Sequence, residues 1–175
     1  MPQVSNKVKW CLNKAKRELE EIGLHRGLIK GESDISIAEK HIVKAEHNLN
    51  AALFFEKSGY SDWSASAFFY CLYHCSLAVL RKYGYESRNQ ECTLAVIELL
   101  KEEGKLDIDD KFIDTLKITK IKETDHSAIK IREDFQYGVE IEFKRKEEFD
   151  ELTKMCREFV DMARGIIYKN EMKNG

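Results

Sequence analysis

Residues 61–84 read SDWSASAFFYCLYHCSLAVLRKYG and decide the fold. Small, aromatic and aliphatic side chains occupy nearly every position from Trp63 to Leu80, so a helix built from them is apolar around its circumference. Such a helix is buried within a bundle or in an oligomer interface. We expect a helix over about 61–83, with Ser61 as its N-cap and Gly84 just past its end. This helix should form the centre of the protein.

The sequence on both sides of this stretch also follows the period of an α-helix. We expect further helices over about 4–24, 38–55, 92–103 and 145–169, a short one capped by Asp107 or Asp109, and one from about Asp125 to Tyr137. Residues 139–143 read VEIEF and alternate like a strand, but a lone strand has no partner, so we interpret them as an extended link. The fold class is therefore all-α, an up-and-down helical bundle.

Composition limits the function classes. The chain has 175 residues, 43% hydrophobic and 34% charged, with a formal net charge of −2, so we expect one globular domain over 1–175. This balance gives no whole-chain signal for nucleic acid or membranes, and we expect no membrane partner. The N-terminal sequence lacks the apolar run of a signal peptide. Five cysteines, an odd number without a Cys-x-x-Cys pair, favour free thiols in the cytoplasm.

Three pieces of sequence in order resemble the HEPN domain family. The first is an amphipathic helix with Lys44-Ala45 and Leu49, and the second is the aromatic helix that follows the turn 58–60. The second piece carries Ala65, Ala67, Phe68-Phe69-Tyr70, Tyr73-His74, Leu77, Ala78 and Leu80 before Gly84. The third is 132–138, REDFQYG, which looks like the family's Arg…Asp-Tyr segment and precedes a final amphipathic helix.

The resemblance covers about 35–168 and implies a four-helix core. Residues 1–30 then look like an N-terminal helical addition, and short extra helices complete the chain. The family resemblance further implies a homodimer. Many HEPN proteins are ribonucleases, often toxins paired with a nucleotidyltransferase-like partner, and others bind nucleotides or RNA or serve as interaction modules without catalysis.

The ribonuclease members of the family carry an arginine with a histidine about one helical turn later. The arginine stabilises the charge that develops on the phosphate, and the histidine moves a proton. In this chain Arg132 is followed by Gln136 and Tyr137, with no histidine at that spacing. Arg17 and His25 come closest to the required order, but they lie outside the resembling region. The resemblance therefore leaves the enzymatic activity open.

Five residues are candidates for ligand binding. Arg132 is a candidate phosphate contact, Asp134 belongs to the same segment, and Tyr137 can stack on a base or donate a hydrogen bond. Arg88 lies on a predicted loop, and His74 on the aromatic helix is a candidate proton shuttle or ligand. Four of them have a structural alternative: an ion pair for Arg132, interface packing for Tyr137, a solvated turn for Arg88 and a hydrogen-bonded core histidine for His74.

We expect no metal and no cofactor. Cys71, His74 and Cys75 share one helix, but Cys92 is the only further ligand in view, so buried free thiols are the better interpretation. The leading hypothesis is a non-catalytic or atypical HEPN-like homodimer that binds a nucleotide, RNA or a protein, with a toxin–antitoxin pair that includes a nucleotidyltransferase as one setting for it. One alternative is a metal-independent ribonuclease toxin using Arg132. Another is a structural interaction subunit without a ligand.

Overall fold

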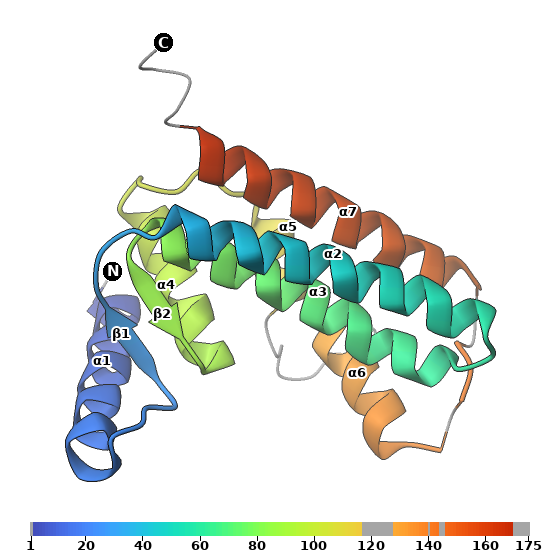
Figure 1. Ribbon diagram of the computed structural model, residues 1–175, viewed down its shortest axis with the longest axis horizontal. Helices are drawn as coiled ribbons and strands as arrows, with labels where there is room; N and C mark the ends of the chain where they lie inside the picture. The colour runs from blue at the N-terminus through green and yellow to red at the C-terminus, as the bar shows by residue number, and fades with distance from the viewer. Residues whose placement is uncertain (1, 117–127, 140, 144–145, 170–175) are drawn as a thin grey trace.

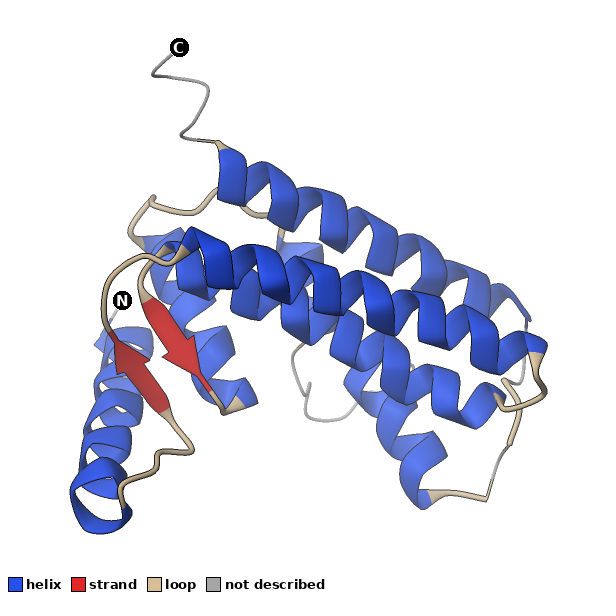
Figure 2. Cartoon of the chain, viewed as in Figure 1, coloured by secondary structure: helices blue, strands red, loops and turns tan. Residues whose placement is uncertain are grey.

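A computed structural model describes residues 2–116, 128–139, 141–143 and 146–169, and Figure 1 shows their arrangement. These residues form helices and two short strands, which confirms the predicted all-α bundle (Figure 2). The elements are α1 (Pro2–Ile22), β1 (Leu28–Lys30), α2 (Ile35–Lys57), α3 (Ser61–Lys82), β2 (Tyr85–Ser87), α4 (Gln90–Glu102), α5 (Asp110–Thr115), α6 (Ala128–Tyr137) and α7 (Lys146–Tyr168).

The aromatic helix α3 lies at the centre, as the sequence predicts. The helices α2, α6 and α7 pack against it, and α2 runs antiparallel to it after the turn at Gly59 (Figure 1). Within the described residues α3 is the one helix long and apolar enough to cross a membrane, and 72% of that apolar window is buried in the bundle. Its hydropathy is thus accounted for by the core it forms, which is consistent with a soluble protein.

The observed helix ends correct two predicted ones. Tyr60, not Ser61, is the N-cap of α3, and the buried Ser61 hydroxyl donates to Glu56 Oε2 at 2.5 Å. Helix α4 begins at Gln90 rather than Cys92 because the Asn89 side chain accepts a hydrogen bond from the backbone N–H of Cys92. Of the two predicted caps for the short helix, Asp109 and not Asp107 is the N-cap of α5.

The small sheet was not predicted from the sequence. β1 and β2 pair antiparallel, with Leu28 opposite Ser87, although no strand was expected at either position. Three-residue strands are too short to show the alternation that marks a strand. Gly84, which precedes β2, allows the two segments to approach this closely. Its φ is +77°, and a Cβ there would lie 2.5 Å from the carbonyl oxygen of Gly31. The Gly31 N–H donates to the Gly84 carbonyl at 2.8 Å.

A disulfide joins Cys11 on α1 to Cys92 on α4, so the expectation of free thiols is wrong for these two residues. Their Cα atoms are 5.9 Å apart, and both side chains are buried where α1 packs on α4. A separation of 81 residues hides this pairing from the sequence. Cys71, Cys75 and Cys156 are free and buried, as predicted.

The described part of 138–143 has no helix and no strand pairing, as expected for the predicted extended link. Phe143 of this link contacts Phe135 on α6 and Phe149 on α7, with ring centroids 4.8 and 5.7 Å apart. Phe149 in turn packs edge-on against Phe68 of α3. This series of aromatic contacts holds α6 against the bundle. The predicted helix start at Asp125 lies outside the described residues.

Candidate functional site

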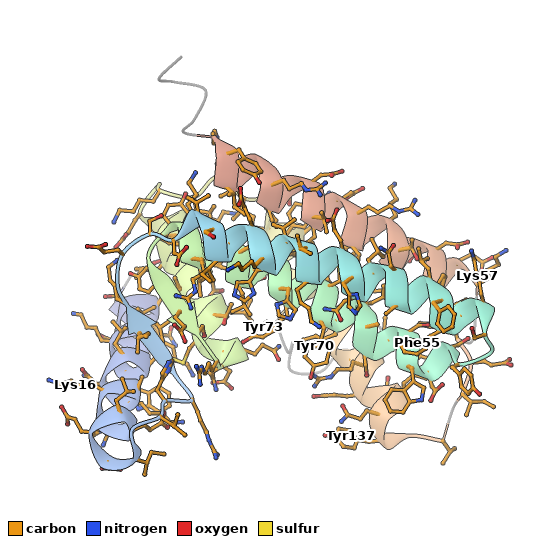
Figure 3. All side chains as sticks on the ribbon, viewed as in Figure 1. Lys16, Phe55, Lys57, Tyr70, Tyr73 and Tyr137 are labelled. Atoms are coloured by element: carbon orange, nitrogen blue, oxygen red, sulfur yellow. A yellow bond between two sulfur atoms is a disulfide. The ribbon has the colours of Figure 1, made fainter. Side chains whose placement is uncertain are left out.

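The outward side of α3 presents a stripe of aromatic and imidazole side chains. Trp63, Tyr70, Tyr73 and His74 follow one another at helical spacing on this side, which we call the α3 face. Trp63 and Tyr70 are 59% and 47% exposed, although large aromatic side chains usually lie mostly buried. In Figure 3, Tyr70 and Tyr73 project below α3, between β2 and α6. An exposed aromatic stripe of this kind is suited to stacking or to contact with a partner.

Arg132 reaches this face from α6. Its guanidinium carbon lies 4.3 Å from the centroid of the Phe69 ring, a cation–π contact, and Phe69 is the buried neighbour of Tyr70. A terminal guanidinium nitrogen lies 3.6 Å from Glu133, while the buried Nε has no hydrogen-bond partner among the described residues. The side chain is 19% exposed, so an anion would contact the terminal N–H groups of the guanidinium and not the buried Nε.

Tyr73 connects the α3 face to α4 and β2. Its ring stacks on Phe69 with the planes 9° apart, so Arg132, Phe69 and Tyr73 form a continuous set of contacts. The Tyr73 hydroxyl lies 3.5 Å from Thr93 Oγ1, and Thr93 donates to Ser87 Oγ at 2.8 Å. Burial raises the pKa of Tyr73 above its ordinary value. The phenol is thus neutral and can serve as a hydrogen-bond donor.

His74 pairs with a histidine that the sequence analysis did not single out. The Nδ1 atoms of His74 and His41 on α2 lie 3.0 Å apart, and the rings stack at 5.3 Å between centroids. Burial is the main reason why the pKa of His74 is lowered to about 4, and the nearby His41 and Lys44 lower it further. Burial, with Arg81 nearby, also lowers the pKa of His41. Both rings are therefore neutral at pH 7, and one Nδ1–H donates to the other Nδ1 in complementary tautomers.

The remaining candidates on α6 lie toward solvent. Tyr137 is 79% exposed at the end of α6, and Figure 3 shows it pointing away from the bundle. Asp134 is exposed and forms an ion pair with Lys130, one turn earlier. Its backbone carbonyl accepts a hydrogen bond from the N–H of Gly138. No described contact joins Tyr137 or Asp134 to the α3 face, whereas Arg132 and His74 both lie on it.

Arg88 belongs to a separate polar cluster at β2. Its guanidinium lies 3.4 Å from Glu86, which also bonds Arg81 at 2.6 Å and lies 3.4 Å from the buried His25. Burial alone would raise the pKa of Glu86, but the hydrogen bond and charge of Arg81, with Arg88 and His25, bring it below its ordinary value. Arg88 is 56% exposed and belongs to an ion-pair network, which neither the ligand-binding role nor the solvated turn considered from the sequence included.

The buried cysteines form a separate thiol cluster. Hydrogen bonds with Cys156 and Cys75 lower the pKa of Cys71 to about 5. The pKa of Cys156 is raised, and burial is the largest cause. Cys92 is in the disulfide and His74 is bonded to His41, so the four zinc candidates do not come together. In the described part of the chain, no three His, Cys, Asp or Glu side chains are placed to hold a metal ion.

Comparison with known proteins identifies the family of this chain. The comparison with curated proteins gives no significant match. The sequence model described as HEPN domain matches residues 38–166, which run from the first turn of α2 to the end of α7. This stretch is well over half of the chain and contains α3, the α3 face and Arg132. Helix α1 and β1 lie before it. The chain belongs to the HEPN domain family.

Proposed function

We propose that this HEPN protein binds RNA or a nucleotide at the α3 face without cleaving it, and that it does so as a homodimer. Membership of the family is consistent with a role in nucleotide or RNA binding or with a ribonuclease role. The observation that favours binding is Arg132, whose partly buried guanidinium lies on Phe69 beside Tyr70 and Tyr73.

The chemistry of this face suits a phosphate beside a base. A guanidinium offers several N–H donors in a fixed plane, which match phosphate oxygens. The exposed Tyr70 and Trp63 rings provide flat apolar surfaces on which an unpaired base can stack. Neutral Tyr73 and the His41–His74 pair can add hydrogen bonds without charge.

The same residues argue against cleavage. Metal-independent cleavage of RNA needs a base for the 2′-hydroxyl and an acid for the leaving oxygen, with pKa values near the working pH. The pKa of His74 is about 4, so the ring is a weak base at pH 7 and carries no proton to donate as an imidazolium. Its Nδ1 is also occupied by His41. The described residues near Arg132 thus offer no well-matched acid–base pair.

The proposal is tested with purified full-length protein, a labelled single-stranded oligouridine, and ATP and GTP as nucleotide probes. We expect Arg132→Ala to weaken binding by about tenfold, the usual loss for a charge-assisted hydrogen bond. Arg132→Lys should recover part of the affinity. Arg164→Ala is the matched control, because Arg164 is an exposed α7 arginine paired with Glu46. Equal affinity of wild type and Arg132→Ala for every probe would count against the site.

The alternative is a ribonuclease toxin that uses Arg132, in a pair with a nucleotidyltransferase-like partner. Metal-independent cleavage of RNA by the purified protein, lost in Arg132→Ala, would establish this alternative and overturn the non-catalytic proposal. A structural subunit is the third possibility. It predicts that neither RNA nor a nucleotide binds in the same titration.

The homodimer is supported by exposed apolar residues on α2. Val43 and Phe54 are each 65% exposed, and their separation of eleven residues puts them on one side of the helix. We expect light scattering at micromolar concentration to give twice the chain mass of 20.4 kDa. Phe54→Glu should shift the mass to that of a monomer, and Trp10→Glu on α1 should not. A monomeric wild-type protein would contradict the proposal.

A further inference from the structure

The outer face of α1 is strongly basic. Residues 1–17 contain Lys7, Lys9, Lys14, Lys16 and Arg17 and no Asp or Glu, although the whole chain has a net charge of −2. Lys9, Lys16 and Arg17 are exposed, and Figure 3 shows Lys16 pointing outward from α1. Among the described residues no acidic side chain pairs with Lys9 or Arg17, and Lys16 reaches only Glu20, at 4.0 Å. The net charge of the chain conceals this local excess of cations.

An exposed tryptophan lies within this basic face. Trp10 is 50% exposed, and the ammonium groups of Lys7 and Lys14, one turn before and one turn after it, each lie 5.4 Å from its ring centroid. The arrangement puts a flat aromatic surface between two cations. Proteins that bind single-stranded nucleic acid combine these features, because the ring stacks on a base while the cations contact the flanking phosphates.

The opposite face of α1 shows what kind of polyanion fits. A helix that lies on a membrane inserts its apolar face into the lipid. Here the apolar residues Val8, Cys11 and Ala15 are buried against the rest of the protein, and Cys11 is bonded to Cys92. Trp10 is exposed among the cations, and the other exposed large apolar side chains of α1, Leu19 and Ile22, lie near its C-terminal end beside Glu18, Glu20 and Glu21. The apolar side of α1 is thus covered over most of its length, and its exposed apolar end lies among acidic side chains, which favours a polynucleotide over an anionic lipid surface.

We propose that the outer face of α1, carried by Lys9, Trp10, Lys16 and Arg17, binds single-stranded RNA. This rests on the proposed RNA-binding function and extends it to a second surface, outside the matched residues 38–166. The bridge to Cys92 and the ion pair of Lys7 with Glu91, 2.7 Å long, hold α1 on α4. A fixed helix loses little conformational entropy when it binds a ligand.

The test compares the full-length wild type with K9Q/K16Q/R17Q and with Trp10→Ala, using labelled oligouridine at several salt concentrations. The triple variant should weaken binding at low salt at least tenfold. It should also lower the slope of log affinity against log salt by about 2, since each lost phosphate contact on a single strand contributes about 0.7. Trp10→Ala should weaken binding about fivefold or more with an unchanged slope, because stacking carries no charge.

K57Q/K154Q/R157Q is the matched control, since it removes the same charges from exposed positions on α2 and α7. Figure 3 places Lys57 at the opposite end of the molecule from Lys16. An equal loss of affinity in this control would show a net-charge effect and overturn the proposal, as would wild-type affinity in K9Q/K16Q/R17Q. So would binding to vesicles of anionic phospholipid without binding to oligouridine.

The two proposals fail in different ways. If Arg132→Ala weakens binding and K9Q/K16Q/R17Q does not, the α1 surface is wrong and the α3 face stands. If only the α1 variants weaken binding, RNA binds at α1 and the α3 site is wrong. If wild-type protein binds no oligouridine, both RNA proposals are wrong.

Discussion

His41 and His74 meet across α2 and α3 with their Nδ1 atoms 3.0 Å apart, at a point where burial keeps both rings neutral. Protonation of either ring in the folded protein would remove this hydrogen bond or place charge in a half-buried site. The unfolded chain has no such restriction, so the pair couples folding to pH.

The free energy of unfolding should therefore fall as the pH is lowered from about 6.5 to about 4. The folded-state pKa of His74 is about 4, below the ordinary 6.5, so the unfolded state binds more protons in this window and stability rises with pH. Because the pair is only half-buried, we expect a loss of about 1 kcal/mol after allowance for solvent screening. Urea unfolding at a series of pH values measures it.

His74→Gln should reduce this pH dependence, and His47→Gln, at an exposed position on α2, should leave it unchanged. A wild-type stability that is flat between pH 6.5 and 4 would contradict the prediction.

Loss of the disulfide should lower the free energy of unfolding by about 4 kcal/mol, the chain-entropy expectation for a loop of this length. The measurement is urea unfolding of the wild type with and without a thiol reductant, beside Cys11→Ser/Cys92→Ser. The reductant should destabilise the wild type and leave the double variant unchanged. An equal effect on both proteins would mean that the bridge does not form in solution.

Gly84→Ala should destabilise the protein by about 2 kcal/mol or more, because Gly84 has a positive φ and a Cβ would lie 2.5 Å from a backbone carbonyl. The clash separates β1 from β2 and loosens the attachment of α1. Gly165→Ala is the contrasting control: it lies within α7 with no atom within 4 Å of a new Cβ, so it should stabilise by about 0.5–1 kcal/mol. Thermal unfolding with both variants tests the opposite signs.

Lys82→Met should lower stability by about 1–3 kcal/mol. The Lys82 ammonium at the end of α3 donates 2.7 Å hydrogen bonds to the carbonyls of Ile166 and Ile167, in the last turn of α7. Helix carbonyls at this end have no partner in their own helix, and a cation also complements the helix dipole. Hydrogen exchange should show faster opening of the last turn of α7. Unchanged exchange there would indicate that the lysine does not stabilise the helix end.

The sequence predicts the bundle well because its signals are long. Helices of more than 20 residues such as α2, α3 and α7 repeat their apolar period many times, and α3 is apolar enough to require burial. The β1–β2 pair and the Cys11–Cys92 bridge could not be predicted in the same way. Each is a contact between residues far apart in the chain, and three-residue strands carry no pattern.

The candidate site was predicted in part. Arg132 and His74 could be named from the sequence, and the structure places both on the α3 face. Their neighbours Phe69 and His41 were missed as site residues, because Phe69 looks like any core aromatic and His41 meets His74 only when α2 folds back on α3. The asymmetric charge of residues 1–17 was visible in the sequence, but its meaning depends on which face of α1 is buried.

The Cys11–Cys92 bridge also divides the molecule mechanically. It closes a covalent ring that contains β1, α2, α3 and β2, whereas α5, α6 and α7 lie on the arm beyond it. When the chain is stretched from its two ends, tension passes through the sulfur–sulfur bond and bypasses the ring. About 280 Å of extended chain stays hidden until that bond is reduced. The central helix α3 is thus shielded from a pulling force that strips α7 away from it.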